Sequence, residues 1–268
     1  MATTPALFDL LSLPSLAHAA EAPVGLGTAG AYSVLGGVTV TNTGPSRLSG
    51  NLGVSPGTAT TGFPPGIVGG ATHAGDASAA QAQSDLVVAY DDAAGRAPTA
   101  SVAGDLVGRT VTIGVYKSTG PLALSGTVTL NGQGDPNAVF IFQIASTLIT
   151  ASASSVSLIN SAQACHVFWQ VGSSATLGTT SAFIGTIMAL TSITVNTGTV
   201  VEGRALARNG QVSLDSNVFL APLCNTAPTT TTALTTTTTG PTTTTISPTT
   251  TTVAPTTTTI APTTTTIA

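Results

Sequence analysis

Short segments in which apolar and polar residues alternate fill most of the chain beyond residue 110. They are rich in Val, Ile, Thr and Ser, and Gly and Asn residues separate them. This alternation predicts half-buried β-strands joined by tight turns. The predicted strands are residues 111–115, 122–130, 139–144, 156–159, 167–171, 175–177, 183–190, 193–195, 200–207 and 212–214.

One earlier segment, residues 71–95, has a helical period instead. Thr72 is placed to cap its start, and Gly95, with Pro98 beyond it, to end it. We expect a single helix of about 34 Å that lies lengthwise across roughly seven stacked strands. Its apolar face comprises Ala79, Ala82, Leu86, Ala89, Tyr90 and Ala93, and Gln81, Ser84 and Asp91 lie opposite.

The strand segments repeat along the chain. Residues 174–177, 192–195 and 211–214 are similar to one another and are spaced by 18 and then 19 residues. A repeat of this length fits one turn of a coil with three short faces. Each turn covers apolar side chains of its neighbour that a single turn could not remove from water. The sequence therefore predicts a mainly β fold, a β-solenoid whose turns stack in register beside one helix.

Strand parity defines one outward surface of this solenoid. Residues alternate between core and solvent along a strand, so apolar residues such as Leu177 and Ile193 point inward. The outward set is small or β-branched and almost uncharged: Ala123, Ser125, Thr147, Ile149, Ala151, Ser174, Thr176, Ser192, Thr194, Asn196, Gln211, Ser213 and Asp215. A flat grid of methyls and hydroxyls can order water in a pattern near that of an ice plane. Thr is also an ordinary solvent-facing strand residue, so such a ladder can equally bind nothing.

Composition excludes several classes of protein. Of the 268 residues, 42% are hydrophobic and 6% charged, and the net charge of −4 is spread without runs. No basic stripe is present to neutralise phosphates, which argues against nucleic acid as a partner. No stretch reaches about 18 apolar residues, so no transmembrane segment is expected.

The two ends of the chain differ from the middle. Residues 1–22 resemble a secretory signal peptide, with an apolar run at 6–13 and an A-x-A site at 17–19, although Asp9 interrupts the run and no basic residue precedes it. Residues 226–268 are uncharged and repeat Pro-Thr-Thr-Thr-Thr with a period of seven from Pro241. Pro in every repeat forbids a helix, so a disordered stalk or linker is expected, one that could hold residues 23–225 away from a cell wall.

Two cysteines, Cys165 and Cys224, occur in a chain that looks exported. An even count in an oxidising compartment favours one disulfide, which would staple the last turns to the chain end. Two separate buried thiols are the alternative.

Residues for catalysis or metal binding are sparse. Beyond residue 140 the folded part offers only Glu202, Arg204, Arg208 and Asp215 as charged groups, and Glu202 and Arg204 share parity and are expected to pair on the surface. The three histidines, at 18, 73 and 166, have no ligand spacing. We expect no enzyme, no catalytic residue, no metal and no cofactor.

Several segments together resemble the microbial ice-binding protein family. They are residues 26–30, 53–59, 61–66, 89–95, 136–144, 203–205 and 209–210, and the resemblance covers about residues 23–222. It implies a right-handed, discontinuous β-solenoid of triangular section flanked by one long helix. It also implies an extracellular protein, secreted or attached to the cell surface, that binds ice through one flat face, and we expect a monomer.

The resemblance assigns candidate residues to that face. The family's Thr-Ala-x-Thr pattern falls on residues 58–61, and its ladder falls on Ala123, Ile149, Thr176, Thr194 and Ser213, the outward set that parity also gives. Ala123 and Ile149 lack hydroxyls, so a non-catalytic adhesion or structural module without ice activity is the second hypothesis. The candidate ice-binding face as a whole is Thr58, Thr60, Thr61, Ala123, Thr147, Ile149, Ser174, Thr176, Ser192, Thr194, Asn196 and Ser213.

Overall fold

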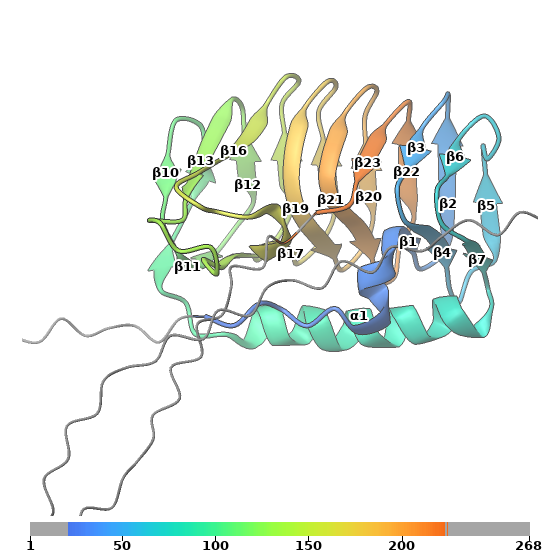
Figure 1. The fold of residues 1–268 in the computed structure, drawn as a ribbon, viewed down its shortest axis with the longest axis horizontal. Helices are drawn as coiled ribbons and strands as arrows, with labels where there is room; N and C mark the ends of the chain where they lie inside the picture. The colour runs from blue at the N-terminus through green and yellow to red at the C-terminus, as the bar shows by residue number, and fades with distance from the viewer. Residues whose placement is uncertain (1–20, 223, 225–268) are drawn as a thin grey trace, which may run out of the picture. The chain divides into compact units, whose positions relative to one another are not determined.

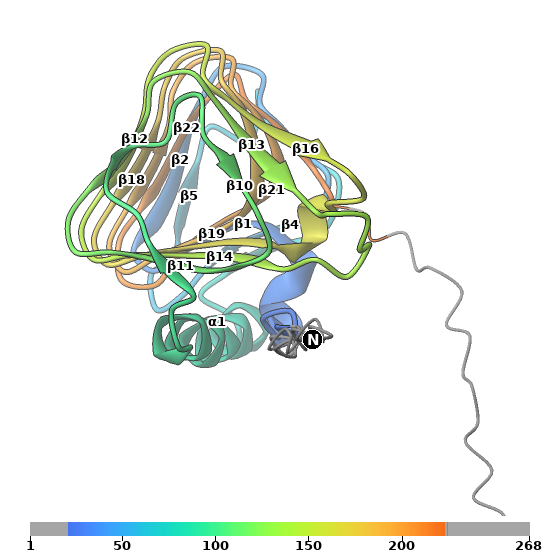
Figure 2. The same ribbon diagram turned by 90° about the vertical axis from the view of Figure 1, so that its left-hand side faces the viewer.

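Parallel strands stacked in successive coils make up most of the computed structural model, which describes residues 21–222 and 224. The predicted mainly β fold with one helix is confirmed (Figure 1). Viewed along the stack, each coil outlines a triangle (Figure 2). Buried apolar side chains fill the interior of the coils. The signal-like residues 1–20 and the Thr/Pro-rich segment 226–268 lie outside the described residues.

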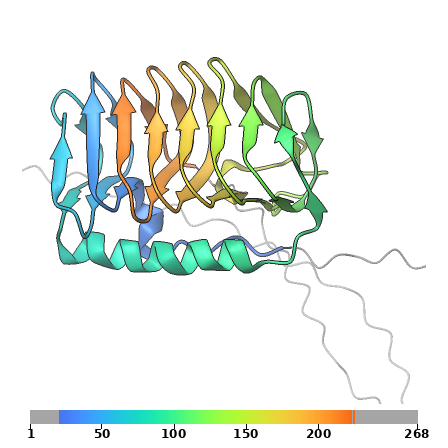
Figure 3. The ribbon, with the colours of Figure 1, turned by 180° about the vertical axis from the view of Figure 1, so that it is seen from behind.

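The strands form two sheets that make three faces. The first face, called here the flat face, is an eight-stranded sheet in the order β5 (Ala59–Thr61), β2 (Thr39–Thr43), β22 (Val212–Asp215), β20 (Ile193–Val195), β18 (Ala175–Leu177), β15 (Leu148–Thr150), β12 (Leu122–Leu124) and β9 (Gly104–Asp105). Figure 3 shows these strands side by side.

The fifteen-stranded sheet supplies the other two faces. The helix face consists of β7 (Thr72–Ala74), β4 (Asn51–Val54), β1 (Tyr32–Gly36), the second halves of β21 (Val200–Ala207) and β19 (Ala182–Ala189), β17 (Val167–Val171), β14 (Phe140–Ile144), β11 (Gly114–Ser118) and β8 (Ala100–Ser101). The third face consists of β6 (Ile67–Val68), β3 (Arg47–Leu48), β23 (Val218–Leu220), the first halves of β21 and β19, β16 (Ser155–Ile159), β13 (Thr127–Asn131) and β10 (Thr110–Val111).

Glycines allow two long strands to turn from the third face onto the helix face. Gly185 in β19 and Gly203 in β21 are in register and have φ values of +112° and +157°. A Cβ atom on Gly203 would overlap the carbonyl oxygen of Gly185, so only glycine fits this corner. The predicted strands 111–115 and 122–130 are wrong as continuous elements. The first is divided by a similar corner at Gly114, between β10 and β11, and the second by the corner between the flat face and the third face, between β12 and β13.

The corner at Gly203 also corrects the predicted pairing of Glu202 with Arg204. The two residues lie on different faces, and the Arg204 guanidinium instead donates from Nε to the Gly30 carbonyl at 2.8 Å. Burial lowers the pKa of Arg204. The rule that residues two apart in a strand lie on the same side of the sheet therefore does not hold where the strand bends.

The coils do not stack in chain order. β1 to β7 form one end of the stack, and the chain then crosses to the opposite end and winds back from β8 to β23. The last coil meets the first, since β21, β22 and β23 pair with β1, β2 and β3. This arrangement is the discontinuity that the family resemblance implies.

Helix α1 (Ala77–Gly95) makes the crossing between the two ends of the stack. Eight inter-strand steps separate β7 from β8, a distance of about 38 Å. The 19 residues of the helix cover about 28 Å, and residues 96–99 complete the span. The expected start at residue 71 is wrong: residues 72–74 form β7, and Asp76 rather than Thr72 caps the helix, accepting a hydrogen bond from the Ala79 N–H at 2.9 Å.

The helix buries the face that its period predicts. Its buried residues are Ala79, Ala82, Leu86, Ala89, Tyr90 and Ala93, which pack on Leu35, Val115, Ile141, Phe168, Met188 and Leu206 of the helix face. Four alanines on this stripe allow the helix to approach the sheet closely. Gln83 and Tyr90 then donate to the carbonyls of Ala207 and Val171 at 3.0 and 3.2 Å, which fixes the helix on the strands.

One disulfide joins Cys165 to Cys224, with Cα atoms 5.6 Å apart. The predicted pairing is confirmed, and the alternative of two separate thiols is wrong. Cys165 follows β16 and Cys224 follows β23, so the bond ties the end of the last coil to the side of the stack. It closes a loop of 59 residues, which restricts the unfolded chain.

Stacked aromatic rings fill the interior of the middle coils. The Phe142 and Trp169 rings lie 4.0 Å apart at an interplanar angle of 8°, and both side chains are completely buried.

We predict that Phe142→Ala lowers the free energy of unfolding by about 3–5 kcal/mol, because it leaves a ring-sized cavity. Denaturant unfolding followed by the fluorescence of Trp169 measures this loss. Val88→Ala, on the exposed side of the helix, should change stability by less than about 0.5 kcal/mol.

Asp85 fastens the 3₁₀ segment η1 (Gly27–Ala31) to the helix. Its Oδ2 accepts hydrogen bonds from the hydroxyl and the N–H of Thr28, each at 2.6 Å, and these bonds with one from Gln81 lower the pKa of Asp85. A carboxyl whose pKa is lower in the folded state stabilises the fold above its unfolded pKa of about 3.9 and loses that contribution as pH falls through the folded pKa. We predict that wild type exceeds Asp85→Asn in Tm at pH 7 and that the gap closes toward pH 2. A gap independent of pH would contradict this assignment.

Candidate functional site

The outward side of the flat face carries an in-register row of short side chains. From β12 to β5, the row is Ala123, Ile149, Thr176, Thr194, Ser213, Thr41 and Thr61. In the terminal strand β9, the charged residue Asp105 is in register with Ala123. The residues between these positions, such as Leu177 and Val195, are buried in the core. Neighbouring side chains of the row are therefore separated by the strand spacing of about 4.8 Å.

A second row lies two residues earlier in each strand. Backbone N–H groups of Leu122, Leu148, Ala175 and Ile193 donate to the carbonyls of Thr147, Ser174, Ser192 and Gln211, so the ladder continues through these positions. In β2 and β5 the same row holds Thr39 and Ala59, which are in register. The two rows form a grid about seven strands long and two residues wide, roughly 6.7 Å between rows.

Two hydroxyls of the grid bond along the stack rather than into the core. The Thr41 hydroxyl donates to Ser213 Oγ at 3.3 Å, and Thr39 donates to the Ala59 carbonyl at 2.9 Å. Both bonds run between adjacent coils, so they restrict the orientations of the Thr39 and Thr41 side chains.

Only two charged residues belong to the strands of this sheet, and both lie at its margins. Asp105 is in the terminal strand β9, where a hydrogen bond from the Ser125 hydroxyl, aided by backbone N–H groups, lowers its pKa. Asp215 is at the end of β22 and accepts from the Thr197 hydroxyl at 2.5 Å. The interior of the grid is therefore uncharged.

The structure brings most of the expected residues into the grid. Ala123, Ile149, Thr176, Thr194, Ser213 and Thr61 lie in the first row, and Thr147, Ser174 and Ser192 lie in the second. Ile149 is the most exposed apolar side chain among them, at 52% exposure.

Three expected residues lie elsewhere. Thr60 is in register with the buried Val40, so it belongs to the inward-facing row. Thr58 precedes β5 and lies at a corner against Gly75. Asn196 follows β20 at the next corner, where its carbonyl accepts from the Asn217 amide at 2.8 Å.

Sequence reasoning missed Thr39 and Thr41. Residues 38–43 alternate between Val or Asn and Thr and therefore carry a strand signal. Their place in the grid depends on the pairing of β2 with β22, which joins residues 172 positions apart. A local pattern indicates the strand but not its neighbour.

Metal binding has a poor basis in the part of the chain that the structure describes. Its one group of three ligand-type side chains within reach of one another is Cys165, His166 and Cys224, whose ligand atoms lie within 4.8 Å. The two sulfur atoms are joined in the disulfide, so they are not the thiolates that bind zinc. Burial also lowers the pKa of His166. Among the described helices, none is long and apolar enough to cross a membrane.

The fold and this face define a class of protein: parallel β-coils with one flanking helix and a flat, hydroxylated, uncharged side. Residues 34–220 match the model of the family described as ice-binding-like, and the chain belongs to this family. It is 52% identical over 205 residues to an ice-binding protein of Nostoc sp. (strain HG1), with 76% of each chain covered. It is 38% identical to an ice-binding protein of Colwellia sp., with 74% of this chain and 84% of that protein covered.

Solved structures agree with the sequence relatives. The crystal structure of an ice-binding protein from an Antarctic biological consortium matches with a TM-score of 0.76 and 48% identity, over 79% of this chain and 97% of that one. The ice-binding protein of the Antarctic ascomycete Antarctomyces psychrotrophicus matches with a TM-score of 0.72 and 37% identity, over 76% of this chain and all of that one.

Proposed function

We propose that the protein binds ice through the flat face and thereby inhibits ice growth or recrystallisation. The observation that carries the proposal is the grid itself, two in-register rows that consist mostly of Thr, Ser and Ala, with Ile149 and Gln211 as larger members, and whose interior is uncharged. Fixed methyls and hydroxyls at regular spacing hold the first water layer in place, and many weak contacts add up over such an area. A charged side chain inside the grid would bind its own hydration shell and disturb that layer.

The other two faces are unsuited to this role. Helix α1 covers the helix face. The third face carries two charged residues, Arg47 and Glu202, among its outward residues, and both lie in strands with a neighbour on each side. Elimination therefore leads to the same surface as the positive argument.

The remaining expectations for the protein are proposals on general grounds. Parallel crossover connections are right-handed in about 98% of cases, which supports right-handed coils. The disulfide supports an oxidising, extracellular location, either secreted or on the cell surface, with residues 226–268 as a stalk or linker toward a cell wall. The terminal strands of the stack have only two or three residues, which discourages end-to-end pairing and supports a monomer. The uncharged interior of the flat face offers no acid or base, which supports a role without catalysis.

We predict that Thr176→Tyr and Thr194→Tyr each raise the concentration needed to inhibit ice recrystallisation at least about tenfold. A tyrosine in the middle of the grid projects beyond its neighbours and breaks the flatness without touching the core. The assay is recrystallisation inhibition and crystal shaping by the full chain, beside thermal unfolding.

Thr129→Tyr provides the matched control, since Thr129 is a half-buried, outward residue in register with Ser157 on the third face. It should retain full activity. Activity retained in both flat-face variants would move ice contact to another surface. If the folded wild-type protein neither inhibits recrystallisation nor shapes ice crystals, the proposal is wrong. A non-catalytic adhesion or structural module is then the better function.

We also predict that Ile149→Thr lowers the concentration required for recrystallisation inhibition by about twofold. The substitution replaces the most exposed apolar side chain of the first row with a hydroxyl-bearing one and extends the Thr run beside Thr176. Ile159→Thr on the third face, where Ile159 is 40% exposed, is the control and should not change activity. Equal gains in both variants would show that the effect comes from general polarity and not from the grid.

A further inference from the structure

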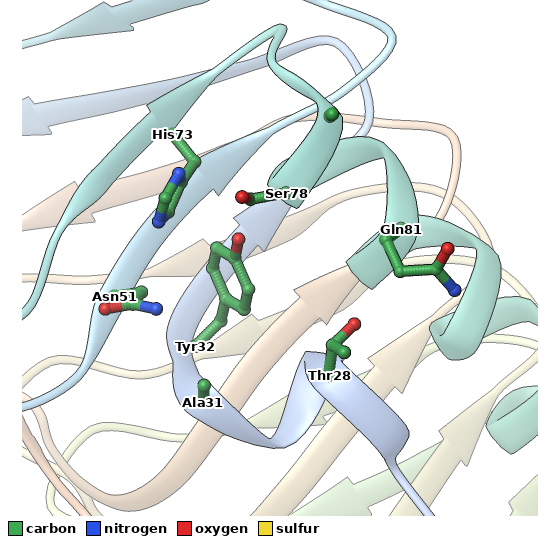
Figure 4. A pocket seen from close by; sticks show the side chains of 8 residues that line it. Thr28, Ala31, Tyr32, Asn51, His73, Ser78 and Gln81 are labelled. Carbon is green, nitrogen blue, oxygen red and sulfur yellow. The ribbon is translucent and has the colours of Figure 1, made fainter.

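A hollow of about 420 Å³ opens beside the helix start, away from the flat face. It lies among η1, β4, β7 and the first turn of α1, and its polar lining includes Thr28, Tyr32, Asn51, His73, Ser78 and Gln81 (Figure 4). Its volume is at the lower end of the range for small-molecule sites. None of these residues belongs to the ice-binding argument.

Tyr32 is the central residue of the hollow. It is only 3% exposed, and its hydroxyl points between His73 and Ser78 (Figure 4). Within residues 21–222 and 224, no side chain or backbone group makes a hydrogen bond with this hydroxyl. The hydroxyl is not among the buried atoms of the described residues that lack a partner, so the oxygen is the part of Tyr32 that stays accessible from the hollow. A ligand in the hollow can therefore reach a hydroxyl that no protein group occupies. Burial and the nearby charge of Asp76 raise the pKa of Tyr32, so the group is a neutral O–H that can both donate and accept.

Three further side chains each have one polar atom in a hydrogen bond within the protein and a second polar atom that is not used. Asn51 Oδ1 accepts from the Ala71 N–H at 2.9 Å, so its NH₂ group remains for a ligand. Gln81 Nε2 donates to Asp85 Oδ1 at 2.9 Å, so its carbonyl oxygen remains. His73 Nδ1 bonds Asp76 Oδ2 at 2.7 Å, so Nε2 remains. Each bond restricts the orientation of a side chain that lines the hollow.

The remaining groups are a mixture of donors and acceptors without a positive charge. Asp76 and Asp85 lie behind the lining and disfavour an anion, while their oxygens are engaged with the helix N-terminus, His73, Thr28 and Gln81. A ligand that satisfies such a set must itself carry several groups that both donate and accept, and sugar hydroxyls do so.

We propose that this hollow binds a neutral saccharide of mono- or disaccharide size, with the Tyr32 hydroxyl at the centre of the contacts. Asn51 donates to the sugar, and Gln81 and His73 accept from it. Since the hollow belongs to the helix face, the flat face stays free while a glycan is bound. The protein could thus be held on a glycan-bearing surface and present its flat face outward.

Ligand-detected NMR with the full chain tests this proposal, with N-acetylglucosamine and glucose as neutral probes. We expect Kd values of about 1–10 mM for at least one of them, as is usual for a small, open site. Glucose 6-phosphate and glucosamine serve as anionic and cationic comparisons and should bind more weakly. Absence of binding by both neutral probes, or a preference for either charged probe, would overturn the proposal.

Tyr32→Phe separates a binding role from a structural one. Because the hydroxyl has no partner in the described structure, its removal should leave Tm unchanged or slightly higher, yet weaken sugar binding at least about fivefold. Tyr116→Phe is the matched control, since the Tyr116 hydroxyl donates to the Thr112 carbonyl at 2.8 Å in β11, near the opposite end of the stack. It should lower Tm and keep the affinity. Equal affinities in wild type and Tyr32→Phe would refute the site.

Discussion

The pairing of the last coil with the first is the contact on which the rest of the structure depends. β22 pairs with β2 over four residues, and β21 and β23 pair with β1 and β3 on either side. Closing a loop of about 170 residues costs on the order of 4–5 kcal/mol in chain entropy, and this cost grows only slowly with length. One coil's worth of buried side chains and backbone hydrogen bonds can offset it. Helix α1 reduces the search, because its alanine stripe places the N-terminal coils beside the strands they must meet.

That junction also determines the extent of the flat face. Without it, the first row of the grid would end at Ser213, and Thr41 and Thr61 would belong to a separate surface. Parallel pairing without a register shift in this sheet keeps every outward residue in line with its neighbour, so the regularity of the surface follows from the regularity of the core. Leu177, Val195 and Leu214 occupy equivalent inward positions and maintain a constant distance between coils.

Sequence reasoning was successful where structure depends on local period and failed where it depends on long-range pairing or on bends. The apolar stripe of the helix and the row from Ala123 to Ser213 follow from periods of 3.6 and 2, which any segment carries within itself. The predicted start of the helix was wrong, because residues 72–74 form strand β7, which pairs with β4. The predictions for Thr60 and for the pairing of Glu202 with Arg204 were wrong for a related reason. Whether Thr60 points outward depends on its strand partner, since it is in register with the inward residue Val40. Glu202 and Arg204 lie on different faces because the strand bends at Gly203.

The triangular coil has three faces, so different faces can have different surface properties. An uncharged, regular face is a liability in water, since a protein needs charged surface for solubility. Here the flat face needs none, because charges gather on the other sides: Arg47 and Glu202 on the third face, and Asp91 with Arg208 along the helix at 3.0 Å. The helix in turn removes one apolar face from solvent, so only two faces meet water and each can be specialised. An uncharged, regular surface and a charged surface thus coexist around one core, and substitution on either can proceed without repacking the other.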